Sequence, residues 1–272
     1  MPELAEIKIM SDHINNKCEG KVFFLVEKNP VHKSKTDLSK INDLLSTGGK
    51  ITSESRGKEL RMDFENKKGE RISLFFMMGM SGNFKFGKAQ DEPKHTHLKF
   101  CTDNDEFLFM YDLRRFARWK IGSEWSTDRG PCPVKEFDNF KKNVESNLDK
   151  RCFGKPIYEV LMDQKYFNGI GNYLRAEILG RINSDPKESA RDFISKNSDL
   201  LQLCKRIPQE AYILGGGRLK DWYNNEQINE EGLDFKSWMR FYYNKDECIP
   251  FKDSSGRTFW IDKKWKQNYQ AT

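Results

Sequence analysis

Residues 161–179, LMDQKYFNGIGNYLRAEIL, contain the pattern that decides the fold of the second half of the chain. Apolar residues at helical spacing stand on both sides of the turn G-I-G-N at 169–172. Two glycines allow the backbone to turn tightly, and Asn172 can cap the helix that follows. Free N–H groups at the start of such a helix can bind phosphate, although a plain turn between two helices explains the same letters. The pattern predicts a helical C-terminal half with a candidate phosphate site at Gly171 and Asn172.

The remainder of the chain shows two other patterns. Apolar residues recur at steps of three or four over residues 2–17, which predicts a helix. From residue 21 to about residue 125, short stretches rich in β-branched and aromatic residues alternate with turn-prone clusters, which favours a sandwich or barrel. The tail CIPFKDSSGRTFWID, residues 248–262, predicts a hairpin with its turn at residues 254–256.

Composition limits the class of protein. The 272 residues suggest two domains, or one large one, at about 100–200 residues per domain. No run of about eighteen apolar residues is present, and the start MPELAEIKIM lacks the features of a secretory signal. Six cysteines without a C-x-x-C pair argue against a disulfide scaffold or a common zinc ribbon. A net charge of +6 permits a nucleic-acid partner without requiring one.

Pro2 and Glu3 could carry chemistry. Removal of Met1 would leave Pro2 as a secondary amine, and a free α-amino group titrates about two units below lysine. Such an amine attacks an aldehyde-like carbon to form an iminium, which is an electron sink for elimination. Glu6 can share a helix face with Glu3, and two nearby acids can take different roles. The alternative is that Pro2 starts a helix whose dipole the two acids favour.

The run RRFARWK, residues 114–120, interleaves cations with aromatic rings. This alternation suits a nucleic-acid surface, because cations meet phosphates and rings stack or wedge between bases. The alternative is a strand with one buried aromatic face and one solvated basic face. His95 and His97 are interpreted as a solvent-facing pair rather than a metal site, since neither a C-x-x-C pair nor a third histidine lies nearby in sequence.

Six stretches occur in an order that resembles the Fpg/Nei family of DNA glycosylases, and they span nearly the whole chain. They are MPELAE (1–6), SRGKELR (55–61), MMGMSG (77–82), LRRFARW (113–119), residues 161–179 and SSGRTFW (254–260). The run from 162 to 179 is similar to the helix–two-turn–helix signature of the family. Together with the RRFARW run and the GRTFW tail, it looks most like the endonuclease VIII-like glycosylases that carry a zincless finger.

The resemblance implies a bifunctional DNA glycosylase and AP lyase that excises oxidised bases and then cuts the strand by β,δ-elimination. Pro2 would be the nucleophile at C1′ and Glu3 the general acid/base, with Glu6 helping to position the active-site groups. Lys58 matches the family's lysine that contacts the phosphate beside the lesion; its alternative is an exposed turn lysine.

The resemblance also implies how DNA is held. Gly171, Asn172 and Arg257 would contact phosphate. Met80, Arg114 and Phe116 fall on the positions that fill the space left by the extruded nucleotide, and their chemical types fit a flexible apolar residue, a multidentate donor and a flat wedge. The alternative places Met80 and Phe116 in the core.

The implied fold is α+β and multidomain: an N-terminal helix plus β-sandwich, then a helical helix–two-turn–helix domain with a zincless β-hairpin finger. We expect boundaries at residues 1–130, a linker over 131–150, the helical domain over 151–246 and the finger with its tail over 247–272. The expected partner is damaged double-stranded DNA, bound by a monomer without cofactor, metal or membrane. The expected location is intracellular, and nuclear in a eukaryotic cell.

Three departures from the family pattern stand out. Only Cys248 lies where bacterial members carry four zinc-binding cysteines, so the hairpin is expected to hold through Phe251, Phe259 and Trp260. Leu4-Ala5 blurs the assignment to a substrate branch, and no role is transferred to Arg218. Two rival functions remain open: a non-catalytic binder of damaged or abasic DNA, and an RNA-binding protein that uses a similar helical turn.

Overall fold

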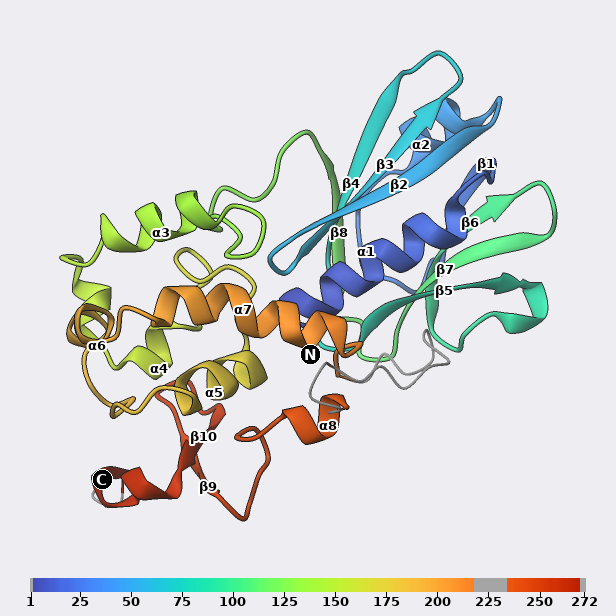
Figure 1. Cartoon of the computed structure of the whole chain (residues 1–272). Coiled ribbons are helices and arrows are strands. Elements are labelled where there is room, and N and C mark those ends of the chain that lie inside the picture. The colour runs from blue at the N-terminus through green and yellow to red at the C-terminus, as the bar shows by residue number, and fades with distance from the viewer. Residues whose placement is uncertain (1, 218–233, 270–272) are drawn as a thin grey trace. The chain divides into compact units, whose positions relative to one another are not determined.

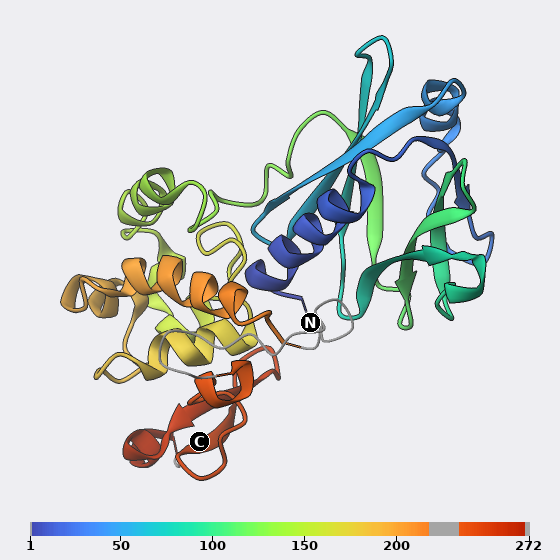
Figure 2. The same cartoon turned by 45° about the vertical axis from the view of Figure 1, so that its right-hand side comes forward.

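The computed structural model describes residues 2–217 and 234–269. The chain forms two compact units, which Figures 1 and 2 show from two directions. Unit 1 comprises residues 1–2 and 6–126, and unit 2 comprises residues 3–5 and 127–272. Glu3 and the first two helical residues after it, Leu4 and Ala5, therefore group with the C-terminal half rather than with the rest of that helix.

Unit 1 contains an eight-stranded antiparallel sheet with the order β5-β7-β6-β1-β2-β3-β4-β8. Its strands are β1 (Phe23–Lys28), β2 (Gly49–Arg56), β3 (Glu59–Asn66), β4 (Arg71–Met77), β5 (Gly82–Lys88), β6 (Thr96–Thr102), β7 (Glu106–Asp112) and β8 (Arg118–Gly122). A single residue pair, Phe23 with Gly49, joins β1 to β2. The sheet is therefore two four-stranded halves connected at one point.

Aromatic side chains fill the space between the two halves of this sheet. Phe64 of β3 stacks on Phe100 of β6 with ring centroids 5.9 Å apart. Phe76 of β4 meets the edge of Phe84 of β5 at 5.4 Å. All four rings are fully buried. This is the face-to-face packing of a sandwich, with the difference that the two layers share one continuous hydrogen-bonded sheet.

Two helices complete unit 1. Helix α1 (Leu4–Cys18) buries its apolar stripe, which includes Ile7, Met10 and Ile14. Its Asn15 carboxamide donates to the Ser53 carbonyl at 2.9 Å and accepts from the Ser53 N–H at 2.7 Å, so a side chain joins the helix to β2. The short helix α2 (Ser39–Leu45) and the strands β2 and β5 were absent from the sequence prediction, whereas β8 is the strand that was offered as the alternative for residues 114–120.

Unit 2 is helical with one hairpin. Its elements are α3 (Phe137–Glu145), α4 (Ile157–Val160), α5 (Asn172–Gly180), α6 (Ala190–Lys196), α7 (Leu200–Ile213), α8 (Phe235–Trp238), β9 (Cys248–Lys252) and β10 (Thr258–Asp262). The expectation of a linker over 131–150 is wrong, because α3 lies there and its Phe140 and Val144 are fully buried in the core of unit 2. Charged residues around these two apolar positions hid the helix in the sequence.

The β9–β10 hairpin packs through aromatic rings, as the sequence predicts. Tyr158 of α4 stacks on Phe259 at 5.4 Å and meets the edge of Phe251 at 5.7 Å. Trp260 lies 5.1 Å from Tyr243, measured between ring centroids. Phe259 and Trp260 are buried, so the hairpin is continuous with the core of unit 2.

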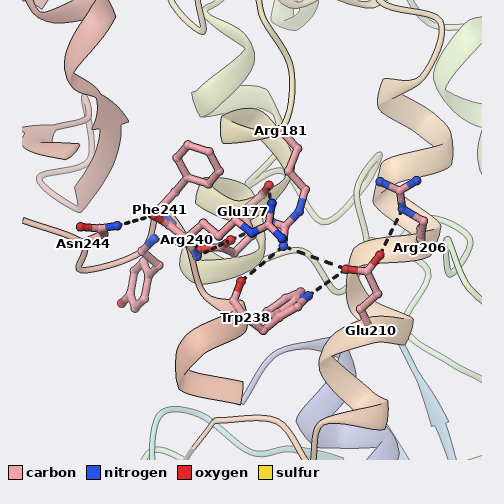
Figure 3. A network of polar contacts seen from close by, with 9 residues as sticks. Glu177, Arg181, Arg206, Glu210, Trp238, Arg240, Phe241 and Asn244 are labelled. Atoms are coloured by element: carbon pink, nitrogen blue, oxygen red, sulfur yellow. Dashed lines mark hydrogen bonds and ion pairs between the residues drawn. The ribbon is translucent and has the colours of Figure 1, made fainter. Parts of the chain in front are cut away.

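A buried carboxylate connects α5 to the segment that follows α8 (Figure 3). Glu177 is fully buried, and its Oε1 accepts the N–H groups of Phe241 and Tyr242, each at 2.9 Å. Its Oε2 accepts the Arg240 N–H at 3.1 Å and pairs with the Arg181 guanidinium at 2.7 Å. One side chain on α5 therefore fixes three consecutive backbone groups ahead of the hairpin.

The same network reaches α7. The Trp238 indole donates to Glu210 at 2.8 Å, and the Arg181 guanidinium lies over the Trp238 ring at 4.9 Å. Figure 3 shows these side chains between the helices from which they project. Since α5, α7 and α8 meet in one set of polar contacts, this corner of unit 2 is held by charge as well as by apolar packing.

We expect Glu177→Gln to lower the free energy of unfolding by about 3 kcal/mol, because it removes a fully buried charge that pairs with the half-buried Arg181 and turns an amide N–H toward a backbone N–H of residues 240–242. Urea denaturation measures the change. Glu188→Gln is the matched control, because Glu188 pairs with Lys196 at the surface and loss of that pair should cost less than about 1 kcal/mol. Equal losses in the two variants would contradict a structural role for the Glu177 contacts.

Candidate active site

The Glu3 carboxylate lies at the N-terminus of α5. Oε2 accepts the N–H groups of Gly171 at 2.8 Å and Leu174 at 3.2 Å, and Oε1 accepts the N–H of Tyr173 at 3.0 Å. N–H groups in the first turn of a helix have no partner within the helix itself, and the helix dipole favours a negative charge there. Glu3 is 2% exposed. A carboxylate 168 residues away in sequence from Gly171 therefore caps this helix, and the expectation that Asn172 caps it is wrong.

Two glycines make this approach possible. Gly169 has φ +102°, and a Cβ there would lie 2.7 Å from the Leu4 side chain. At Gly171 a Cβ would lie 2.2 Å from the carboxyl carbon of Glu3. The Leu4 N–H also donates to the Gly169 carbonyl at 3.1 Å. The G-I-G turn is thus shaped to receive Glu3 and Leu4.

Asn172 is the first residue of α5, and its carboxamide is held on two sides. Its Nδ2 donates to the Thr258 carbonyl of β10 at 2.7 Å, and its Oδ1 accepts from the Arg175 guanidinium. An amide nitrogen carries two hydrogens; one is donated to Thr258, and the Asn172 side chain also makes a hydrogen bond with the Tyr242 phenol. Asn172 is therefore oriented by the hairpin and by its own helix.

Arg175 extends this arrangement to the hairpin turn. The guanidinium is fully buried and donates to Asp253 at 2.9 Å and to the Tyr158 carbonyl at 2.8 Å. Asp253 in turn accepts the Arg257 N–H at 2.9 Å. Burial alone would raise the pKa of the Asp253 carboxyl, but Arg175 and the turn N–H groups hold it below its usual value. The exposed Arg257 side chain thus projects from a turn that α5 itself fixes.

Tyr242 is a further polar group beside Glu3 and Asn172 that the sequence did not identify. Burial raises the pKa of its phenol to about 12; a hydrogen bond with the Asn172 side chain opposes that shift, and the charge of Glu3 adds to it. The Glu177 carboxylate holds the Tyr242 backbone. Because Tyr242, Arg175 and Asp253 lie far apart in sequence, no local motif could have indicated them.

Unit 1 holds the other predicted catalytic positions. Lys58 is half-buried in the two-residue turn between β2 and β3, and Gly57 before it has φ +57°, as a tight hairpin turn requires. The alternative of an exposed turn lysine is therefore right about the turn and wrong about the exposure. Glu6 is 2% exposed on α1, and Pro2 is half-buried just before that helix. The roles of these three residues stay predictions.

The three residues expected to fill the space left by a nucleotide are all at the surface. Met80 is 44% exposed and Phe116 is 51% exposed, so their assignment to the core is wrong. The Arg114 guanidinium lies 5.0 Å from the centre of the Phe116 ring. Of the basic-aromatic run, only residues 118–120 lie in a strand, β8, and residues 113–117 form the loop before it.

The histidines differ from the expectation. His97 is buried, and its Nε2 lies 2.9 Å from the Asp112 carbonyl, so it is not part of a solvent-facing pair. Within residues 2–217 and 234–269, no group of three or more His, Cys, Asp or Glu side chains is arranged to hold a metal ion. No helix in the described part of the chain has the length and apolarity to cross a membrane. Arg218 lies outside the described residues.

Comparison with known proteins decides the family. Residues 1–119 match the formamidopyrimidine-DNA glycosylase N-terminal domain. Endonuclease 8-like 1 of Homo sapiens is 35% identical over 290 aligned residues, which cover 96% of this chain and 72% of that protein. The chain belongs to the Fpg/Nei family of DNA glycosylases. The formamidopyrimidine-DNA glycosylase of Rickettsia bellii is 27% identical over 95% of this chain and 94% of its own length.

Solved structures show that the Fpg fold extends over nearly the whole chain. A Lactococcus lactis FPG mutant in complex with Fapy-dG DNA superposes with a TM-score of 0.76 at 23% identity, covering 96% of this chain and 98% of the other. MutM in complex with carbocyclic 8-oxo-G DNA gives a TM-score of 0.78 at 22% identity over the same shares. The N-terminal sheet unit, the helices and the C-terminal hairpin are therefore those of an Fpg-like fold.

We expect Gly171→Ala to slow base release from damaged DNA about a hundredfold, because the new Cβ would displace the Glu3 carboxyl and a misplacement of about 1 Å can cost that much. Single-turnover kinetics measure the rate. Gly154→Ala is the matched control, since a Cβ at Gly154 meets nothing within 4 Å. A normal rate in folded Gly171→Ala protein would show that the placement of Glu3 does not matter.

Proposed function

We propose that this Fpg/Nei protein is a bifunctional DNA glycosylase and AP lyase that removes oxidised bases from duplex DNA. The substrates would be oxidised pyrimidines, hydantoins and formamidopyrimidines. The observation that carries the proposal is the Glu3 carboxylate, buried and held by three backbone N–H groups directly after Pro2. An acid that is rigidly held beside a potential amine nucleophile is the arrangement that iminium chemistry needs.

The proposed reaction begins with attack of the Pro2 nitrogen on C1′ of the damaged nucleotide. The C1′–N bond to the base breaks, and the departing base takes up a proton from water. The Glu3 carboxylate accepts the proton of the Pro2 nitrogen and passes it to the ring oxygen, which allows the sugar to open. The resulting iminium links Pro2 to C1′ and withdraws electrons from C2′. Loss of a C2′ proton then expels the 3′ phosphate, and a second elimination expels the 5′ phosphate. Water finally releases the sugar fragment and returns Pro2 to the amine.

The phosphate contacts would come from groups already ordered in each unit. In unit 2 Arg175 orients the Asn172 carboxamide and, through Asp253, the backbone of the turn that carries the exposed Arg257 side chain, while the neighbouring Gly171 N–H already donates to Glu3. In unit 1 Lys58 stands in a tight hairpin turn. Preordered donors bind without a large entropic cost, so these contacts suit recognition of a kinked backbone. The relatives whose structures contain abasic and lesion-bearing DNA support duplex DNA as the partner.

Borohydride trapping on duplex DNA with one abasic site tests the chemistry. We expect a covalent adduct that peptide mapping places at Pro2, with intact mass showing that Met1 is removed. Pro2→Gly should lose the Pro2 adduct, and Glu3→Gln should slow the reaction by about 10²–10⁴. Glu19→Gln, which makes the same change at an exposed position, should react normally.

The outcomes separate the candidate functions. An adduct at Lys58 would mean a lyase with a different nucleophile. Absence of any adduct from protein that lacks Met1 would overturn the catalytic proposal and leave a non-catalytic binder of damaged or abasic DNA. Preference for structured RNA over abasic duplex would overturn the choice of DNA.

Salt dependence tests the contact made by the finger hairpin. Each neutralised phosphate contributes about −0.9 to the slope of log K against log salt concentration. We expect Arg257→Ala to make that slope shallower by about one such contact. Fluorescence anisotropy with abasic duplex measures it, and Lys196→Ala, which removes an exposed cation paired with Glu188, is the control. An unchanged slope in Arg257→Ala would mean that Arg257 contacts no phosphate.

A further inference from the structure

Asp112, at the end of β7, is a fully buried carboxylate with an unusual set of donors. Its Oδ2 accepts the N–H groups of Phe116 and Ala117, each at 2.7 Å. Its Oδ1 accepts the Arg114 N–H at 3.1 Å and the Ser81 hydroxyl. Three of the donors are backbone N–H groups of one loop, and the fourth is the Ser81 hydroxyl of another loop. Asp112 therefore connects the two loops through hydrogen bonds.

The first of these loops, residues 113–117, needs such support. Arg115 has φ +56°, a left-handed conformation that costs a residue with a Cβ about 1–2 kcal/mol. Side chains on both sides of it are exposed: Leu113 is 65% exposed and Phe116 is 51% exposed. Few apolar contacts hold these side chains, and the contacts to Asp112 lie at the backbone. The buried Asp112 carboxylate thus maintains the backbone conformation of the loop, while the side chains of Leu113 and Phe116 stay at the surface.

The second loop, residues 78–81, is attached to the first at two points. Ser81 donates to Asp112 and its hydroxyl also lies 3.2 Å from the Arg114 N–H. At Gly79, where φ is +61°, a Cβ would lie 2.9 Å from both the carbonyl carbon and the Cβ of Phe116. The backbone of one loop therefore packs directly on the other, and Met80 stands between these two points of attachment.

The backbone of Asp112 is fixed as well. Its carbonyl oxygen lies 2.9 Å from Nε2 of the buried His97. The His97 ring lies 4.7 Å from that of His32, which stacks on Trp119 at 4.0 Å, measured between ring centroids. Trp119 belongs to β8, which follows the first loop. The support of the two loops thus extends into the sheet.

We propose that Asp112 is the positioning residue that makes these two loops one rigid wedge, presenting Met80, Arg114 and Phe116 to the space that an extruded nucleotide leaves. This inference rests on the proposed function, because only an enzyme that extrudes a base needs such a wedge. Extrusion costs a few kcal/mol, and loops that are already ordered do not add their own ordering entropy to it. Asp112 touches neither DNA nor the reacting atoms; it acts through the loops.

Asp112→Asn tests the proposal with little change of shape. It replaces one acceptor oxygen with an NH₂ group, which cannot accept a hydrogen bond. In one orientation the Phe116 and Ala117 N–H groups lose their acceptor, and in the other the Arg114 N–H and the Ser81 hydroxyl lose theirs. We expect base release from a paired lesion in duplex DNA to fall about tenfold or more. Release of the same base from single-stranded DNA should be unchanged, because no stacked partner has to be replaced there. The measured quantity is the ratio of the two single-turnover rates.

The ratio separates positioning from damage to the fold. Asp63→Asn is the matched control, because Asp63 is a buried carboxylate of the same unit that pairs with Arg61 and Ser73. Its ratio should equal that of the wild type, whatever its stability. Ser81→Ala removes one link without leaving donors unpaired, and it should lower the ratio in the same direction if Asp112→Asn fails to fold. A normal ratio in both Ser81→Ala and folded Asp112→Asn would overturn the proposal.

A second measurement keeps the inference separate from the proposed chemistry. A duplex with a stable abasic analogue and 2-aminopurine beside the orphaned base reports insertion of the wedge as increased fluorescence. We expect the wild type and Asp63→Asn to give this increase and Asp112→Asn to lose it. If the wild type releases no base from either DNA, the proposed function fails, while loss of the fluorescence change in Asp112→Asn alone would still support the wedge. Equal signals in all variants would contradict it.

Discussion

The contact between the Glu3 carboxylate and the N-terminus of α5 is the constraint on which the rest of unit 2 depends. Burial of a carboxylate costs free energy unless hydrogen-bond donors surround it. Three backbone N–H groups at the start of a helix supply those donors without any additional side chain. A side chain at 171 would collide with the Glu3 carboxyl group and one at 169 with Leu4, so the turn before the helix must have glycine at both positions. The next residues of the same helix, Asn172 and Arg175, then carry the connection to the hairpin. One glycine-rich turn thereby orients a catalytic candidate and the groups proposed to hold phosphate.

The same device recurs at two other points. Glu177 accepts the N–H groups of residues 240–242, and Asp112 accepts those of Arg114, Phe116 and Ala117. In each case a buried carboxylate fixes a segment without regular structure by its main chain. Charge-assisted hydrogen bonds are stronger than neutral ones and have narrow geometry, so such segments become ordered while their side chains stay available. For an enzyme that must meet a distorted duplex, this combines rigid placement with an exposed functional surface.

The sequence predicted what depends on local composition. Strand β7 could be predicted because it contains three aromatic residues, and β3 because Leu60, Met62 and Phe64 alternate with polar residues. The hairpin could be predicted because Ser-Ser-Gly stands between two apolar runs. Strands β2 and β5 were missed because glycine, lysine and serine dominate them, although their neighbours in the sheet supply the pairing. The order of the motifs predicted which residues form the candidate site, but it did not predict the contacts that these residues make. Glu3 meets residues at 171–174 and Arg175 meets Asp253, and no periodicity reveals partners so distant in the chain.

The hairpin shows how a small element can be held by its neighbours. Two five-residue strands are marginal alone. Here Tyr158 stacks on the inner face of the hairpin, and the buried Arg175–Asp253 pair holds its turn. Because Asp253 also accepts the backbone N–H of Arg257, the position of that arginine is set by a helix rather than by the hairpin's own stability. Arg175 therefore holds both Asn172 and, through Asp253, the backbone of Arg257. The distance between these two residues is set by a side chain of α5.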